Sequence, residues 1–435
     1  MKAASEKFTK NEKSWILYDW ANSVYATIMM AVIYPIYFVS FVNGQGGAGD
    51  SWWGIGVSVA MLIMALAAPV VGALADYRGY KKKLFLVFLV LGLVFTLVSA
   101  LADIWPLMLL GCIVSRIGFS GSCLIYDSFL PDVTTPERMD RVSGFGYAFG
   151  YIGGSTIPFV ISIVLMQAAP AIGISTAGAV KLSLVITVLW WGLFSIPFIK
   201  NIKQVHYIEK PQTGLLRDTF AAIGATLKKI VAHKGVLFFM LAYFFYIDGV
   251  DTVISMSTAY GETLGLGQIS MILALLVTQL VAFPCSILFS RLSRRFSSLR
   301  MLLIAVWIYT AICVLGFVMG FGLEQQYFGI PVATVLFWIL AIMVGSVQGG
   351  IQATSRSHFA RIVPPENAGE FFGFYDIFGK FASIMGPALY SFTKTFTGSS
   401  AYSILSILIL FVAALIIFAA GGKYMKTAGN SGRQQ

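Results

Sequence analysis

Residues 72–83 read Gly-Ala-Leu-Ala-Asp-Tyr-Arg-Gly-Tyr-Lys-Lys-Lys and join two long apolar stretches, 52–75 and 84–102. Each stretch is long enough to cross a bilayer as a helix, which takes about 20 residues. The connection between them is short and ends in three lysines. This segment therefore predicts two neighbouring membrane-spanning helices joined by a short basic loop.

Apolar stretches of the same kind continue along the rest of the 435 residues. The chain is 58% hydrophobic and 11% charged, with a mean hydropathy of +0.82, whereas a soluble domain is roughly half apolar. The sequence therefore predicts an all-α integral membrane protein with twelve transmembrane helices. The ten further stretches are 16–42, 106–130, 143–168, 181–199, 235–260, 270–290, 301–322, 332–355, 371–392 and 401–420.

The basic residues are distributed unevenly between the connections. Twenty-five of the 30 Lys and Arg residues fall in the two terminal segments and in every second loop. By the positive-inside rule, both termini are expected to be cytoplasmic, and in a bacterium the membrane would be the plasma membrane. The net charge of +11 is spread over several short segments that would face anionic membrane lipid. We therefore expect lipid contact and no nucleic-acid binding.

Motifs for a cofactor, a metal site or an enzyme are absent from the sequence. The four cysteines lie in apolar stretches without paired spacing, and the chain has only three histidines, so neither a disulfide framework nor a zinc site is predicted. It contains no phosphate-binding loop, zinc-protease motif or nucleophile elbow. We expect neither an enzyme nor an ATP-driven pump, and no cofactor.

The chain contains an internal repeat. A shift of 229 residues aligns 136–158 with 365–387 at seven identities in 23 positions, and it also aligns Asp19 with Asp248. We predict two six-helix halves, 1–199 and 235–435, joined by a basic cytoplasmic linker, 200–234. Because each half has an even number of helices, the repeat would be parallel, with a cavity between the halves near the midplane of the membrane.

The loop quoted above resembles the signature G-x-x-x-D-x-x-G-x-K-K of the major facilitator superfamily, with Gly72, Asp76 and Gly79 in place. The resemblance implies a latch in which Gly72 allows close helix packing and Asp76 accepts hydrogen bonds from the start of a helix in the other half. The alternative is an ordinary basic loop. The equivalent loop, 291–300, has lost both the glycine and the aspartate, so only the first copy is expected to form the latch.

Three further segments, 15–23, 126–131 and 348–357, resemble the vacuolar amino-acid effluxer-like branch of that superfamily, also called autophagy-related effluxer-like. The resemblance implies the major facilitator fold and transport of a small polar solute, with amino acids as the expected class. The glycine pattern at 146–154 is close to that of facilitator antiporters but lacks its proline, which leaves the direction of transport open.

Ionisable residues inside predicted spans are costly and mark candidate functional sites. Asp248 and Asp251 are three residues apart and share a helix face, which suits a proton-coupling pair; the alternative is that both brace their helix. The repeat aligns them with Asp19 and Asn22, which we include in the predicted cavity. Asp19 could instead be a structural residue at the cytoplasmic rim.

Four more residues are predicted to face the cavity. Arg116 lies in the middle of the fourth span and resembles an arginine of the superfamily at that place, where it would bind a substrate carboxylate; the alternative is an internal ion pair. Gln348 and Gln352 lie on the tenth span. Lys380 is four residues after Asp376, so it either pairs within its own helix or binds an anion in the cavity.

The repeat also aligns Asp127 with Arg356, near the cytoplasmic ends of the fourth and tenth spans. We predict that they form an ion pair between the halves that closes a cytoplasmic gate and separates when the transporter opens inward. The alternative is that each binds its own half or lipid headgroups. As a whole, the sequence predicts a secondary transporter that works by alternating access, with a proton as the expected coupling ion. A lipid scramblase or flippase and a transport-inactive scaffold are the competing interpretations.

Overall fold

The computed structural model describes residues 7–209, 224–228, 230–263, 265, 268–321, 326–327 and 330–431, and nearly all of them are helical. The first part of the chain comprises α1 (Lys10–Tyr25), η1 (Ala26–Ala31), α2 (Ile33–Gly44), α3 (Gly49–Asp76), α4 (Lys81–Leu101), α5 (Trp105–Ser128), α6 (Leu130–Val133), α7 (Met139–Phe149), η2 (Gly150–Thr156), α8 (Ile157–Ala168), η3 (Ala169–Ile172) and α9 (Thr176–Asn201). The second part comprises α11 (Lys234–Thr263), α12 (Gln268–Phe296), α13 (Ser298–Met319), β1 (Gln326–Tyr327), β2 (Ile330–Pro331), α14 (Val332–Ile362), η4 (Pro365–Asn367), α15 (Ala368–Thr397), α16 (Ser400–Ser406) and α17 (Leu408–Ser431).

The apolar stretches form helices long enough to span a membrane, because only a helix satisfies every backbone polar group inside lipid. Within the described residues, eleven helical segments have the length and apolar composition of a membrane span. The twelfth predicted span, 371–392, lies in α15, a helix of 30 residues that contains Asp376 and Lys380. The chain is thus an all-α, multi-pass integral membrane protein, as predicted from its composition.

Two of the spans contain π-helical segments. η1 lies between α1 and α2, and η2 follows α7 at the glycine-rich sequence Gly150–Thr156. The small residues of η2 allow α1 to pack closely, since a β-carbon on Gly153 would overlap the ring of Trp20 and one on Gly154 would lie 2.5 Å from the β-carbon of Ser23. The glycine pattern noted in the sequence therefore accounts for helix packing. Short π segments of this kind are often found at functional sites.

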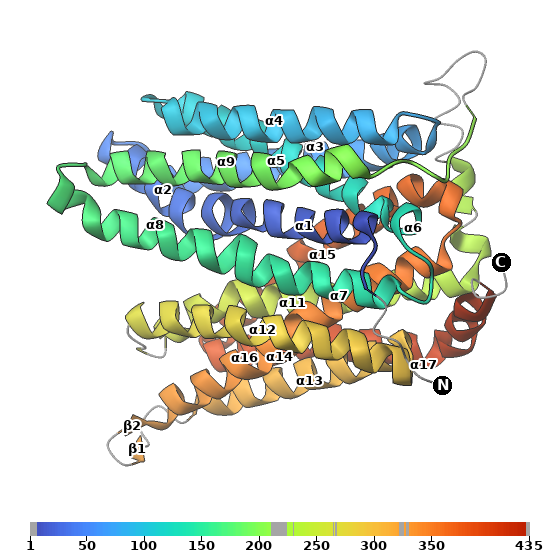
Figure 1. Ribbon diagram of the computed structural model, residues 1–435. Coiled ribbons are helices and arrows are strands. Elements are labelled where there is room, and N and C mark those ends of the chain that lie inside the picture. The colour runs from blue at the N-terminus through green and yellow to red at the C-terminus, as the bar shows by residue number, and fades with distance from the viewer. Residues whose placement is uncertain are drawn as a thin grey trace. The chain divides into compact units, whose positions relative to one another are not determined.

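The chain divides into two compact units (Figure 1). Unit 1 contains 1–135, 149–223 and 364–374, and unit 2 contains 136–148, 224–363 and 375–435. In unit 1, α4 packs along α5 and α1 along α9; in unit 2, α12 packs along α14 and α11 along α17. All of α7 except Phe149 thus belongs to unit 2, and the start of α15 belongs to unit 1.

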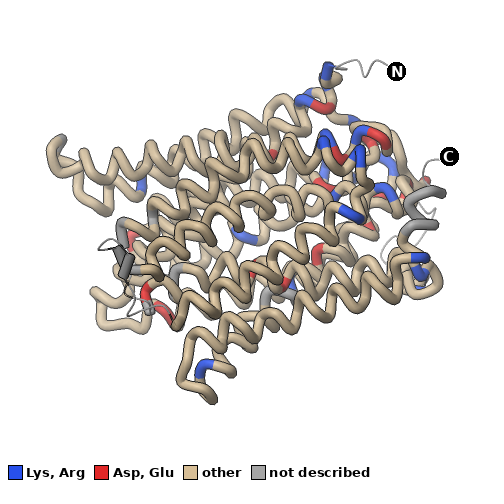
Figure 2. Tube along the Cα trace, turned by 90° about the horizontal axis from the view of Figure 1, so that it is seen from below, with Lys and Arg blue, Asp and Glu red and all other residues tan. Residues whose placement is uncertain are grey.

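Charged residues are concentrated at helix ends. Figure 2 shows most Lys and Arg positions near one end of the helices, with single charged residues along their middle parts. The surface along the helices is apolar, with exposed side chains such as Leu66, Val164 and Ile416. Apolar side chains that face outward are expected where lipid is the solvent.

Candidate transport site and loop contacts

Asp248 is a buried carboxylate in the middle of α11, with 1% of its surface exposed. Its Oδ1 accepts a hydrogen bond from the backbone N–H of Gly386 at 2.9 Å and lies 3.5 Å from the hydroxyl of Thr252. Gly386 precedes Pro387 in α15, where the proline disturbs the regular backbone bonding and leaves nearby groups in need of partners. The other oxygen, Oδ2, is buried and has no hydrogen-bond partner among the described residues. Burying an unpaired carboxylate charge costs free energy, and binding a proton would remove that cost.

The residues grouped with Asp248 by the sequence differ in their surroundings. Asp251, on the same helix, is half-buried. In unit 1, Asp19 and Asn22 are 8% and 6% exposed on α1, and the backbone of Asp19 lies beside glycines of η2. The side chain of Asn22 makes no hydrogen bond with the residues that the structure describes, so its amide is available to a ligand.

Arg116 is half-buried within α5, one residue after Ser115, whose hydroxyl lies 2.8 Å from that of Tyr25. Its guanidinium forms neither a hydrogen bond nor an ion pair with any residue in the described ranges. A cation inside a membrane span without a counter-ion is costly. The predicted alternative, an internal ion pair, is therefore not found among the described residues.

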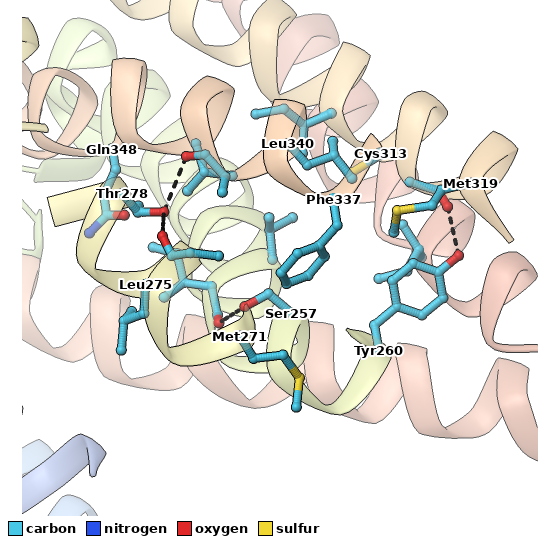
Figure 3. Close-up of a pocket in the computed structure, with 18 of the residues that line it drawn as sticks. Ser257, Tyr260, Met271, Leu275, Thr278, Cys313, Met319, Phe337, Leu340 and Gln348 are labelled. Carbon is cyan, nitrogen blue, oxygen red and sulfur yellow. Dashed lines mark hydrogen bonds between the residues drawn. The ribbon is translucent and has the colours of Figure 1, made fainter. Parts of the chain in front are cut away.

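An apolar cavity of about 110 Å³ lies inside unit 2, between α11, α12, α13, α14 and α16. Figure 3 shows Gln348 and Thr278 at one end and Tyr260 and Met319 at the other. Thr278 and Tyr260 bond to backbone carbonyls. Gln348, which is 8% exposed, makes no hydrogen bond with the described residues, so its amide is free inside unit 2. Gln352, one turn further along α14, is half-buried and is not among the residues that line this cavity.

Lys380 and Asp376 form an ion pair one helical turn apart on α15, and both are half-buried. The pair neutralises itself within one helix, which is the first of the two alternatives that the sequence left open. Binding of an anion by Lys380 stays a prediction and would require this pair to open.

Asp76, at the end of α3, caps the start of α15 inside unit 1. Its Oδ1 accepts a hydrogen bond from the N–H of Gly369 at 2.7 Å, and its Oδ2 accepts one from the N–H of Glu370 at 2.8 Å. These are first-turn N–H groups, which lack partners within their own helix and carry partial positive charge. The helices approach closely, because a β-carbon on Gly72 would lie 2.2 Å from the carbonyl oxygen of Gly369.

The loop after Asp76 is held by the segment that follows α9. Gly79 has a φ of +77°, which favours glycine, and its N–H donates to Oε1 of Gln204 at 2.9 Å. Backbone bonds join Ile208 to both Asp76 and Arg78. The first residues of the predicted linker are therefore fixed to the latch loop.

Asp132 and Lys81 form a buried ion pair beside this loop, with Nζ 3.0 Å from Oδ2. Burial raises the pKa of the Asp132 carboxyl, but Lys81 and the hydrogen bonds from His206 outweigh burial and leave that pKa below its ordinary value. A depressed pKa means that the ionised form stabilises the fold at neutral pH. That contribution is lost as the pH falls through the folded-state pKa. In the sequence, Lys81 and Asp132 both fall between predicted spans, and nothing there indicates that they pair.

Asp140, in the first turn of α7, is the centre of a hydrogen-bond network in unit 2. Its carboxylate accepts hydrogen bonds from the hydroxyls of Ser357 at 2.5 Å and Ser298 at 3.0 Å, and from Nη2 of Arg361 at 2.9 Å. The sequence did not predict this network, because Asp140 and Arg361 lie between predicted spans. The internal repeat did contain an indication of it. The 229-residue shift aligns Asp132, which pairs with Lys81, with Arg361, which pairs with Asp140.

Arg356 is 3% exposed and binds the start of α7 inside unit 2. Its Nε donates to the hydroxyl of Ser143 at 2.9 Å, and its guanidinium lies over the ring of Tyr147. Asp127 is half-buried on α5 in unit 1. An ion pair between Asp127 and Arg356 stays a prediction, and recovery of lost transport when both charges are reversed would support it.

Comparisons with known proteins agree with this architecture. Residues 48–421 match the family model described as vacuole effluxer Atg22 like. The chain is 44% identical over 421 residues to the uncharacterized MFS-type transporter YxiO of Bacillus subtilis (strain 168), and the match covers 95% of each chain. It is 24% identical to autophagy-related protein 22-1 of Penicillium rubens, covering 76% of this chain and 68% of the relative.

Solved structures of transporters share the fold at low sequence identity. A bacterial homologue of the iron transporter ferroportin, in an outward-facing state, superposes with a TM-score of 0.69 at 12% identity, covering 94% of this chain and 99% of that one. The proton:xylose symporter XylE gives 0.67 at 13% identity, with 94% of each chain covered. With the family match across most of its length, this chain belongs to the Atg22-like vacuole effluxer family of major facilitator transporters.

Proposed function

We propose that the protein moves a small solute bearing a carboxylate across the membrane by alternating access, with amino acids as the substrate class. The observation that carries this proposal is Arg116, a guanidinium within a membrane span that has no counter-ion among the described residues. A planar guanidinium binds a carboxylate through two parallel hydrogen bonds. The side-chain amide of Asn22, in the same unit as Arg116, forms no hydrogen bond with the described residues and adds a group that can bind the polar part of such a solute.

We also propose that transport is coupled to protons through Asp248. Its burial, together with an oxygen that lacks a hydrogen-bond partner, suits a carboxyl group that exchanges a proton during the cycle. Asp251, three residues away, is the second member of the proposed pair. The absence of a nucleotide-binding motif in the sequence supports a gradient as the energy source.

The proposed orientation places both termini in the cytoplasm, with the basic loops on the same side. The distribution of 25 of the 30 Lys and Arg residues supports this orientation, because cytoplasmic loops of membrane proteins carry an excess of positive charge. In a bacterium the membrane would be the plasma membrane.

Uptake of a panel of amino acids into proteoliposomes, measured for the wild type and for Arg116→Lys and Arg116→Gln, tests the substrate proposal. Lysine keeps the charge but loses the two-point contact, so we expect KM to rise about tenfold. Glutamine removes the charge, and we expect a loss of about a hundredfold in kcat/KM. Arg291→Gln, on the exposed end of α12, is the control and should behave as the wild type. Full rate and affinity in Arg116→Lys would contradict carboxylate recognition by Arg116.

A further inference from the structure

A second concavity, of about 660 Å³, lies at the loop end of unit 2. It is enclosed by the start of α7, the end of α12, the start of α13 and the end of α14. Its lining contains four arginines, Arg294, Arg295, Arg300 and Arg361, and two carboxylates, those of Glu137 and Asp140. The transport mechanism proposed above does not use this site.

Three of these arginines have no acidic partner. Arg361 is neutralised by Asp140 at 2.9 Å, but Arg294, Arg295 and Arg300 are exposed and form no ion pair with the described residues. Their charges lie within a few residues of one another, on either side of the short turn between α12 and α13. Like charges gathered at one concave site repel one another, and a bound anion would relieve that repulsion.

The buried part of the site carries polar groups that lack partners. Ser293 and His358 line the concavity and are 2% and 4% exposed. Within the part of the chain that the structure describes, neither Oγ of Ser293 nor Nε2 of His358 has a hydrogen-bond partner. Ser297, which precedes α13, provides no side-chain cap for that helix. The first-turn N–H groups of α13 are therefore left without partners in their own helix, at an end that carries partial positive charge.

We propose that this concavity binds a phosphate group. The site combines guanidinium groups that form no ion pair with the described residues, a helix start without a side-chain cap, and buried hydroxyl and imidazole groups. This combination suits a tetrahedral oxyanion with several acceptor oxygens. A phosphate group could come from two sources, the headgroup of an anionic lipid or a soluble phosphate. In the proposed orientation the site faces the cytoplasmic leaflet, where anionic headgroups attract basic residues.

The test uses the full chain purified in detergent, with three probes: phosphatidylglycerol, phosphatidylcholine as the zwitterionic lipid control, and inorganic phosphate against chloride at equal ionic strength. The readouts are the shift in thermal unfolding and, for the lipids, the adducts retained in native mass spectrometry. We expect saturable stabilisation by phosphatidylglycerol or by inorganic phosphate. The pair Arg295→Gln with Arg300→Gln should weaken that binding about thirtyfold, since each arginine near such a surface contributes about fivefold.

Arg291→Gln is the matched control, because Arg291 is an exposed arginine of α12 that does not line the concavity. It should keep the wild-type affinity. If the double glutamine variant does not fold, Arg295→Lys with Arg300→Lys, which keeps the charge but loses the two-point contact, takes its place and should still bind more weakly than the wild type.

Stabilisation by phosphatidylglycerol alone would support a lipid site, and stabilisation by inorganic phosphate would support a site for the phosphate group itself. The proposal is overturned if the wild type responds to neither probe. It is also overturned if Arg291→Gln weakens binding as much as the arginine pair does, because that result would show attraction to the whole basic surface. Neither result bears on transport through Arg116.

Discussion

Asp248 and Arg116 are ionisable side chains inside membrane spans, where a charge without a partner is costly. Asp248 is held by the backbone N–H of Gly386, and Arg116 forms no ion pair with the described residues. The sequence identified Asp248 and Arg116 because ionisable groups in apolar stretches are few. It did not indicate that the backbone N–H of Gly386 would bind Asp248, because that contact joins α11 to α15 across 138 residues. Nor did it decide whether Arg116 has an internal partner, which depends on tertiary packing.

The substitution Asp248→Asn tests proton coupling at the residue scale. Asparagine has nearly the same shape and keeps an oxygen for the N–H of Gly386, but it cannot exchange a proton. We expect uptake driven by a pH gradient to fall about tenfold or more, while exchange of solute across the membrane continues, because exchange needs no net proton movement. Asp103→Asn, at an exposed loop position, is the control. Unchanged gradient-driven uptake in both Asp248→Asn and Asp251→Asn would show that the pair is structural.

Each unit has a network of side-chain contacts where its helices end. The sequence predicted a latch at Gly72 and Asp76 from the loop signature, and it predicted none in the second half because loop 291–300 lacks both residues. Unit 2 nevertheless has a network at the corresponding place, in which the carboxylate comes from Asp140 on α7 and the hydroxyl of Ser298 comes from the start of α13. In unit 2 the carboxylate is therefore on α7 and not in the loop, so a search for the loop signature could not detect it.

Asp76→Asn should weaken the attachment of α15 to α3. Asparagine retains one acceptor oxygen, so one of the two N–H groups at the start of α15 is left buried without a partner. We expect a loss of about 1–3 kcal/mol in the free energy of unfolding, measured by thermal unfolding in detergent. Asp50→Asn, on the exposed first turn of the same helix, should change it by only a few tenths of a kcal/mol. Equal stability of the two variants would contradict the latch.

At the scale of the whole molecule, composition and the spacing of apolar stretches were sufficient to predict the helical membrane fold. They were sufficient because a bilayer allows few alternatives to a row of spanning helices. The internal repeat pointed to two six-helix halves, but it did not reveal that 136–148 packs with unit 2 and 364–374 with unit 1. These segments contain nearly all of α7 and the start of α15, and their assignment depends on the tertiary contacts of Asp140 and Asp76.

We propose that this member of the Atg22-like family carries a carboxylate-bearing solute in exchange for, or together with, protons. Uptake of a panel of amino acids by proteoliposomes containing the wild-type protein, measured with and without a pH gradient, tests this proposal. We expect saturable transport of at least one amino acid, with a rate that changes when the gradient is imposed and that falls when Arg116 is replaced by Gln. Transport that is absent for every amino acid tested, or that is the same with and without the gradient and in Arg116→Gln, would contradict it.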